Sequence, residues 1–167
     1  MVRRCFYSFH YKPDSWRAAQ VRQIGTIEGS PPASDNDWES IASGANQDEK
    51  IKRWIAQQMN GRTCTVVLVG SGTADRKWIN YEIVKSWNEG LGVVGIRIHG
   101  LLNQSQQTSA AGKNPFDFIT HGPTKKPLSS IVKCYDPAGA TGQDRYAWIA
   151  KHLANAVEEA IKIRGAN

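Results

Sequence analysis

Short, compact hydrophobic runs recur along the chain and predict strands. The clearest run, Thr63 to Val69, is β-branched and continuously apolar, which is typical of a central strand covered on both faces. Shorter runs at Arg3 to Phe9, Val93 to Ile98 and Ile131 to Tyr135 predict three further strands. Each of the first three runs is followed by a group of polar or glycine residues, which places a turn there.

Three longer stretches carry apolar residues at helical spacing. The pattern predicts helices over Asp48 to Met59, Asp75 to Asn88 and Asp144 to Ile163. Their apolar faces are Ile51, Trp54, Ile55 and Met59 in the first, Ile79, Ile83 and Trp87 in the second, and Ile149, Leu153, Val157 and Ile161 in the third. A fourth helix after the first strand is expected to be capped by Asp14 and to bury Trp16, Ala19 and Val21.

Two segments show neither the strand-like nor the helix-like spacing of apolar residues. Residues 25–46 are rich in Gly, Pro, Ser and Asp, and no element is predicted there. Residues 101–130 form a connection much longer than the usual loop of about four to six residues, so they are either disordered or functional.

Strands that alternate with helices favour right-handed crossovers and a parallel sheet. We therefore predict one α/β domain over residues 1–167, with a three-layer, flavodoxin-like fold of roughly five parallel strands and a long inserted loop at about 101–130. In such sheets ligands bind beyond the carboxyl ends of the strands. We call this edge the rim.

Composition narrows the function classes. Hydrophobic residues make up 40% of the 167-residue chain, as in ordinary globular domains, and neither a membrane span nor a secretory leader is visible, so we expect a cytoplasmic protein without membrane contact. The three cysteines and four histidines lack metal-ligand spacing, so no metal is expected. The net charge of +6 favours anionic partners, but without a continuous basic stripe nucleic acid is not expected.

The turn Gly70 to Thr73 lies at the rim and precedes a helix. Free N–H groups there can hold phosphate oxygens, although a plain turn explains the same residues. Neither a dinucleotide-binding glycine string nor a P-loop ending is present, and Asp75 stands where the third glycine of the string would be.

Glu82 is the most informative acid, because it lies one helical turn after Trp78 and beside the apolar stripe of its helix. The alternative is a surface glutamate paired with Lys85 or Lys77. Trp78 is likewise either a core residue or a stacking platform.

The segment Trp78 to Val84 resembles the Trp-x-x-x-Glu segment of TIR domains that hydrolyse NAD. Further stretches resemble the TIR-like proteins of bacterial Thoeris antiphage defence; they are Cys5 to Asp14, Asp37 to Glu39, Ile51 to Ile55, Thr65 to Gly70, Arg76 to Trp87 and Gly112 to Phe116.

This resemblance implies a TIR-like fold that converts NAD, as substrate and with no other cofactor, into nicotinamide and a cyclic ADP-ribose-type signal for a separate effector protein. Glu82 would be the catalytic acid, and self-assembly on phage infection would complete the site. The residues implied to bind substrate are Ser8, Phe9, His10, Ser71, Gly72 and Trp78.

Two other functions fit parts of the pattern. A non-catalytic TIR-like module that binds a nucleotide or a protein would use the same rim. A phosphoreceiver shares the fold but requires an aspartate after the third strand, where this chain has Gly70 and Ser71.

Overall fold

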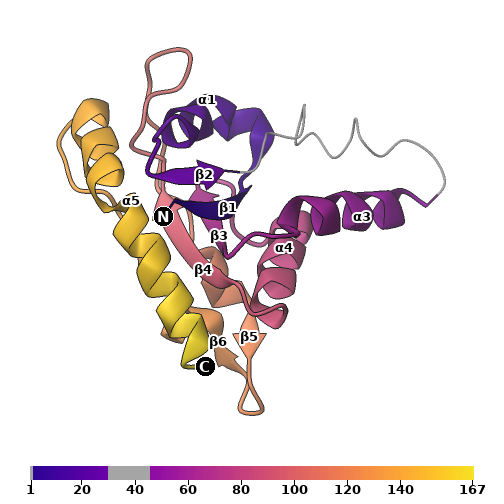
Figure 1. Cartoon of the computed structure of the whole chain (residues 1–167). Helices are drawn as coiled ribbons and strands as arrows, with labels where there is room; N and C mark the ends of the chain where they lie inside the picture. Colours follow the sequence, from indigo (N-terminus) through magenta and orange to yellow (C-terminus); the bar gives the residue numbers. More distant parts are fainter. Residues whose placement is uncertain (1, 30–45) are drawn as a thin grey trace.

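A computed structural model of the chain describes residues 2–29 and 46–167. Five strands form one sheet in the order β2-β1-β3-β4-β7, and every neighbouring pair is parallel (Figure 1). This order is the flavodoxin-like one and confirms the predicted fold class. The strands are β1 Arg3–Ser8, β2 Ile27–Gly29, β3 Cys64–Val69, β4 Gly92–Arg97 and β7 Cys134–Tyr135.

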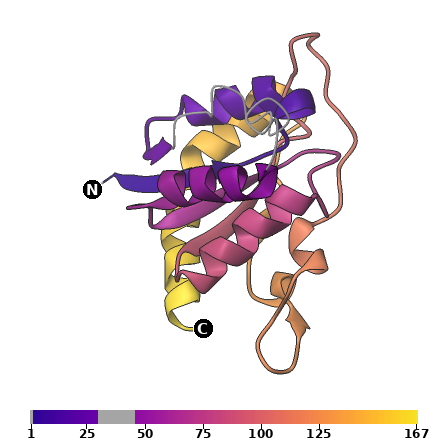
Figure 2. The same cartoon turned by 90° about the vertical axis from the view of Figure 1, so that its right-hand side faces the viewer.

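Helices cover both faces of this sheet. They are α1 Tyr11–Arg22, α3 Gln47–Met59, α4 Lys77–Asn88 and α5 Gly142–Gly165. Helices α1 and α5 lie on one face, and α3 and α4 lie on the other (Figures 1 and 2). Side chains alternate between the two faces along each strand, so each face receives its own apolar set.

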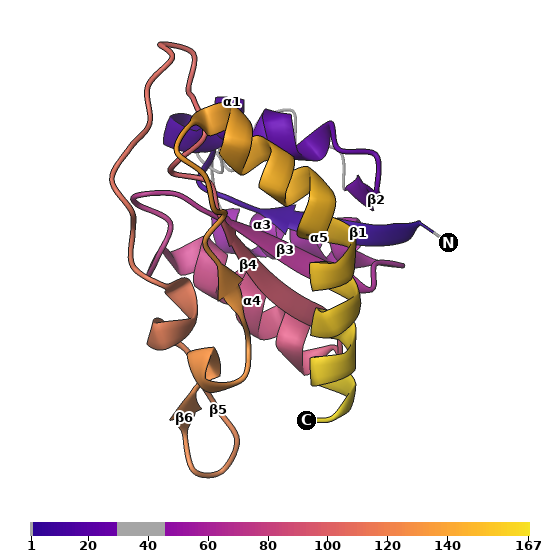
Figure 3. The same cartoon turned by 90° about the vertical axis from the view of Figure 1, so that its left-hand side faces the viewer.

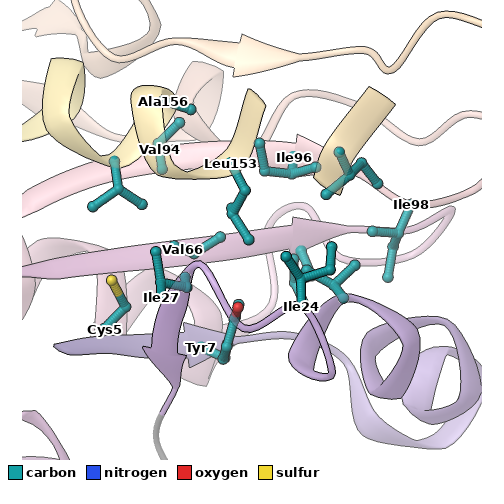
Figure 4. Close-up of a cluster of buried hydrophobic side chains, with 14 of the residues drawn as sticks. Cys5, Tyr7, Ile24, Ile27, Val66, Val94, Ile96, Ile98, Leu153 and Ala156 are labelled. Atoms are coloured by element: carbon teal, nitrogen blue, oxygen red, sulfur yellow. The ribbon is translucent and has the colours of Figure 1, made fainter. Parts of the chain in front are cut away.

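The face under α1 and α5 is a continuous apolar core. Strand residues such as Cys5, Val66 and Val94 meet Leu153 and Ala156 of α5 there (Figure 4). The opposite face is divided into two smaller clusters, one centred on Val67 and Ile83 and one on Phe6 and Ile51.

The predicted face of the first helix is wrong. Helix α1 begins at Tyr11, with His10 as its N-cap, so Asp14 lies inside the helix and is buried instead of capping it. Trp16 and Ala19 are exposed, and Val21 is buried as expected. The buried side consists of Asp14, Arg17, Ala18 and Val21, and its two charged residues hid it from the apolar pattern.

The long insertion is ordered and has two parts. Its second part contains the short helices Pro115–Phe118 and Leu128–Ser130 and the hairpin of β5 Thr120–His121 with β6 Lys126–Pro127. Phe116 and Leu128 are fully buried against the β3 and α4 side chains. Its first part runs along the carboxyl ends of the strands (Figure 3).

Two predictions remain, one for the last strand and one for the segment Asp37 to Glu39. The last strand, predicted over Ile131 to Tyr135, is shorter, because only Cys134–Tyr135 pair with β4. The segment Asp37 to Glu39 lies outside the described residues. Among the helices that the structure describes, none combines the length and apolar character needed to cross a bilayer.

Candidate functional site

Glu82 lies inside the protein, on the side of α4 that faces the sheet. Its side chain is 2% exposed and approaches Ser8, the last residue of β1, which is fully buried. Burial raises the pKa of Glu82 from its ordinary 4.5 to about 8, and the Ser8 hydroxyl partly offsets this rise. At neutral pH the carboxyl group is therefore largely protonated.

The Glu82 carboxyl group and the neighbouring Ser8 hydroxyl lack well-formed hydrogen bonds. Within residues 2–29 and 46–167, neither Glu82 Oε2 nor Ser8 Oγ has a hydrogen bond of good geometry, and both atoms are buried. A buried polar atom without a partner costs about 1–3 kcal/mol. A fold that retains this cost at the end of a strand marks a candidate functional site.

The interpretation of Glu82 as a surface glutamate is wrong. Lys77 pairs with Asp48 at 2.8 Å, and Lys85 pairs with Glu89 at 2.6 Å. Both lysines are thus engaged elsewhere, and the buried carboxyl group faces β1.

A buried hydrogen-bond chain fixes the backbone of α4 at Glu82. Ser86 Oγ donates to the Glu82 carbonyl at 2.7 Å, and the Thr65 and Ser86 hydroxyl oxygens are 2.6 Å apart. Because Ser86 has a single hydroxyl proton, Thr65 of β3 donates to Ser86 in this arrangement. The chain therefore ties the catalytic candidate to the central strand.

Two of the predicted rim loops meet. His10 at the end of β1 lies near the turn after β3, since a Cβ on Gly72 would be 3.8 Å from His10 Nδ1. Ser71 and Gly72 are exposed, and the Thr73 hydroxyl accepts a hydrogen bond from Gly70 N at 2.8 Å. Helix α4 begins only at Lys77, so the turn itself does not form the helix amino terminus.

The histidines at the rim carry little charge. Burial, with Arg76 and Lys12 nearby, lowers the pKa of His10. Burial also lowers the pKa of His99, whose Nε2 is 3.5 Å from Arg145 Nη1. Both rings are therefore mainly neutral at pH 7, and in the described part of the chain no three His, Cys, Asp or Glu side chains gather as a metal site would require.

The two aromatic candidates differ in position. Phe9 is 5% exposed and packs in the core under α1 and α5, on the face of the sheet opposite α4. Trp78 is half-buried on α4. The centre of its ring lies 5.4 Å from the centre of the Tyr81 ring, which meets it edge-on, and 4.9 Å from Lys77 Nζ. The structure thus brings Ser8 to Glu82, places Trp78 one helical turn away and keeps Phe9 apart.

Sequence reasoning missed a buried ion pair beside this site. Arg17 and Asp14 of α1 are 3% and 1% exposed, and Arg17 Nη1 lies 3.3 Å from Asp14 Oδ1. Opposite charges three residues apart on a helix are the signal for such a pair. The predicted face of α1 followed its apolar residues and used Asp14 only as a cap, so the pair was not recognised.

Comparison with known proteins gives two matches. The family model described as "Thoeris protein ThsB, TIR-like domain" matches residues 6–103, more than half of the chain. A protein of Bacillus cereus (strain MSX-D12) named "Putative cyclic ADP-D-ribose synthase ThsB1" is 33% identical over 122 residues, which cover 71% of this chain. The chain spans 64% of the length of that relative.

The family match contains the end of β1 and all of β3, α4 and β4, and so it includes both Glu82 and Ser8. The five-stranded parallel sheet agrees with a TIR-like fold. The chain therefore belongs to the family of Thoeris ThsB TIR-like domains.

Proposed function

We propose that this chain is an NAD-consuming enzyme of the cytoplasm, which releases nicotinamide and forms a cyclic ADP-ribose-type signal in antiphage defence. The single observation that carries the proposal is the buried, poorly satisfied Glu82 carboxyl group beside Ser8 at the carboxyl end of β1. The name of the Bacillus cereus relative supports the same activity.

The chemistry requires one anionic group next to the ribose. When nicotinamide departs, positive charge develops at the anomeric carbon, and a fixed carboxylate stabilises that charge. A hydroxyl or adenine atom of the same molecule then attacks this carbon to give a cyclic product. Water attacking instead gives linear ADP-ribose, so a site that excludes water favours cyclisation.

The burial of Glu82 suits this role. Its pKa of about 8 means that the free protein holds the group mostly neutral at pH 7. The nicotinamide ring of NAD is cationic, and a cation close to a buried carboxyl group lowers its pKa. Substrate binding would therefore ionise the group that the reaction needs.

Partners follow from the same proposal. The product would act on a separate effector protein as a diffusible messenger. Because Glu82 is closed off in the single chain, we also propose that activation opens or completes the site, with self-assembly on infection as the trigger.

The test is to incubate the purified protein, and protein from phage-challenged cells, with NAD and to follow nicotinamide by chromatography. Glu82→Gln should lower nicotinamide release by about 10²–10⁴-fold. The matched control is Glu89→Gln, an exposed residue at the end of the same helix, which should retain activity. Full activity of Glu82→Gln would remove this carboxyl group from the mechanism.

The alternative of a non-catalytic nucleotide- or protein-binding module also has one observation in its favour, because Glu82 is only 2% exposed. Calorimetry with NAD distinguishes the two functions. Binding without nicotinamide release, in resting and in challenged preparations alike, would support the module.

A further inference from the structure

The first part of the long insertion forms a defined strap across the rim, which we define as residues 101–112. Its tip is closed by Asn103, whose backbone N–H donates to Gln107 O at 3.0 Å and whose side chain accepts from Ser105 N and Gln107 N. Farther along, Ser109 N donates to the His99 carbonyl at 2.9 Å. Figures 2 and 3 show the strap beside the carboxyl ends of the strands.

One buried guanidinium holds both sides of the strap tip. Arg17 Nε donates to Leu101 O at 2.8 Å, and Arg17 Nη2 donates to Gln107 O at 2.9 Å. Arg17 Nη1 donates to Asp14 Oδ1 and Pro13 O, both at 3.3 Å. The planar fork of arginine suits this set of acceptors, which a lysine could not reproduce.

The far end of the strap contacts the turn after β3. A Cβ on Gly112 would overlap the carbonyl oxygens of Gly70 and Ser71, so the strap backbone passes directly over this turn. Arg97 Nη1 donates to Gly112 O at 2.5 Å. A Cβ on Gly70 would in turn overlap the Asp14 carboxylate, so Asp14 touches the turn that the strap crosses.

These contacts join α1, the strap and the turn after β3 into one unit. The turn lies beside His10, at the rim where we propose that substrate binds. We propose that Arg17 is a positioning residue that holds the strap across the rim and so keeps water from the proposed site. This rests on the proposed function, in which water competes with cyclisation. Most of the strap lies beyond residue 103, where the family match ends.

The proposal separates two measurable effects of Arg17→Lys, which keeps the charge and loses the fork. Hydrogen exchange of the strap amides, above all Gln107 and Ser109, should become at least about tenfold faster while β3 and β4 stay protected. With NAD as substrate, the ratio of linear to cyclic product should rise several-fold. Arg53→Lys, an exposed position on α3, is the matched control and should change neither quantity.

A second variant keeps the strap testable if Arg17→Lys does not fold. Gly112→Ala forces the strap away from the Gly70 and Ser71 carbonyls without altering Arg17, and it should change exchange and product ratio in the same direction.

Each result has one meaning. Unchanged strap exchange in a folded Arg17→Lys overturns the holding role of Arg17. Faster exchange with an unchanged product ratio overturns the exclusion of water. If the wild-type protein releases no nicotinamide in any preparation, the proposed function fails, and the exchange experiment alone decides whether Arg17 holds the strap.

Discussion

The two faces of the central sheet are packed in different ways. Under α1 and α5, strand residues such as Val66, Val94 and Ile96 meet fully buried apolar side chains of α5, including Leu153. Under α4, the same sheet buries the carboxyl group of Glu82 and the hydroxyl of Ser8 without good hydrogen-bond partners among the described residues. Both faces bury apolar side chains, but the α4 face also holds the Glu82 and Ser8 pair, whose poor hydrogen bonding lowers stability, as functional sites commonly do.

The largest expected effect is that a substitution on one face lowers stability without lowering activity, whereas a substitution on the other face lowers activity without lowering stability. Leu153→Ala should lower the free energy of unfolding by about 2–5 kcal/mol, because it leaves a cavity in the apolar face. Nicotinamide release by the folded variant should be unchanged. Glu82→Gln should do the opposite, removing activity while keeping or increasing stability at neutral pH.

Urea denaturation measures the free energy of unfolding and the nicotinamide assay measures activity, both for the two variants at one temperature. Loss of nicotinamide release in folded Leu153→Ala would mean that the two faces are coupled. A large destabilisation by Glu82→Gln would mean that the carboxyl group is structural.

A second prediction concerns the pH dependence of stability. The pKa of Glu82 is about 8 in the folded protein and near its ordinary 4.5 in the unfolded chain. Between these two values the folded protein binds the extra proton, so the free energy of unfolding falls as the pH rises from about 4.5 and levels off above about 8. The total loss is on the order of 3–5 kcal/mol.

Glu82→Gln lacks this titration, so its stability advantage over the wild type should grow between pH 5 and pH 8.5. Urea denaturation of both proteins at several pH values provides the measurement, and other titrating groups largely cancel in the difference. A constant difference would show that Glu82 ionises as freely in the folded protein as in the unfolded chain.

Elements with a clear hydrophobic period were predictable, and the site around Glu82 was so only in part. Strands such as Thr63 to Val69 and the stripe of α5 follow directly from local hydrophobic period, which sequence records residue by residue. The strand β2 has only three residues, Ile27–Gly29, which is too short for any period to appear. Its place in the sheet depends on pairing with β1, a contact between distant parts of the chain.

The site shows the same limit. The position of Glu82 beside the apolar stripe indicated a sheltered carboxyl group, yet the approach of Ser8, from a strand far away in sequence, was not encoded there. The pairing of Arg17 with Leu101 and Gln107 joins residues far apart in sequence, and no local pattern encodes it. The phase of α1 was misjudged because its buried side carries charged residues.

The smallest expected effect tests the contact between Ser8 and Glu82. The Ser8 hydroxyl lowers the pKa of Glu82, so Ser8→Ala should raise this pKa above about 8, by up to about one unit for the loss of one weak hydrogen bond. Carboxyl-carbon NMR titration measures this pKa without any assay of activity, and the acid limb of kcat/KM should move to higher pH with it. Ser86→Ala is the matched control, because Ser86 binds the Glu82 carbonyl and leaves the carboxyl group untouched, so it should lower stability without moving the pKa. An equal pKa in Ser8→Ala and the wild type would mean that Glu82 is a lone buried carboxyl group on which the Ser8 hydroxyl has no effect.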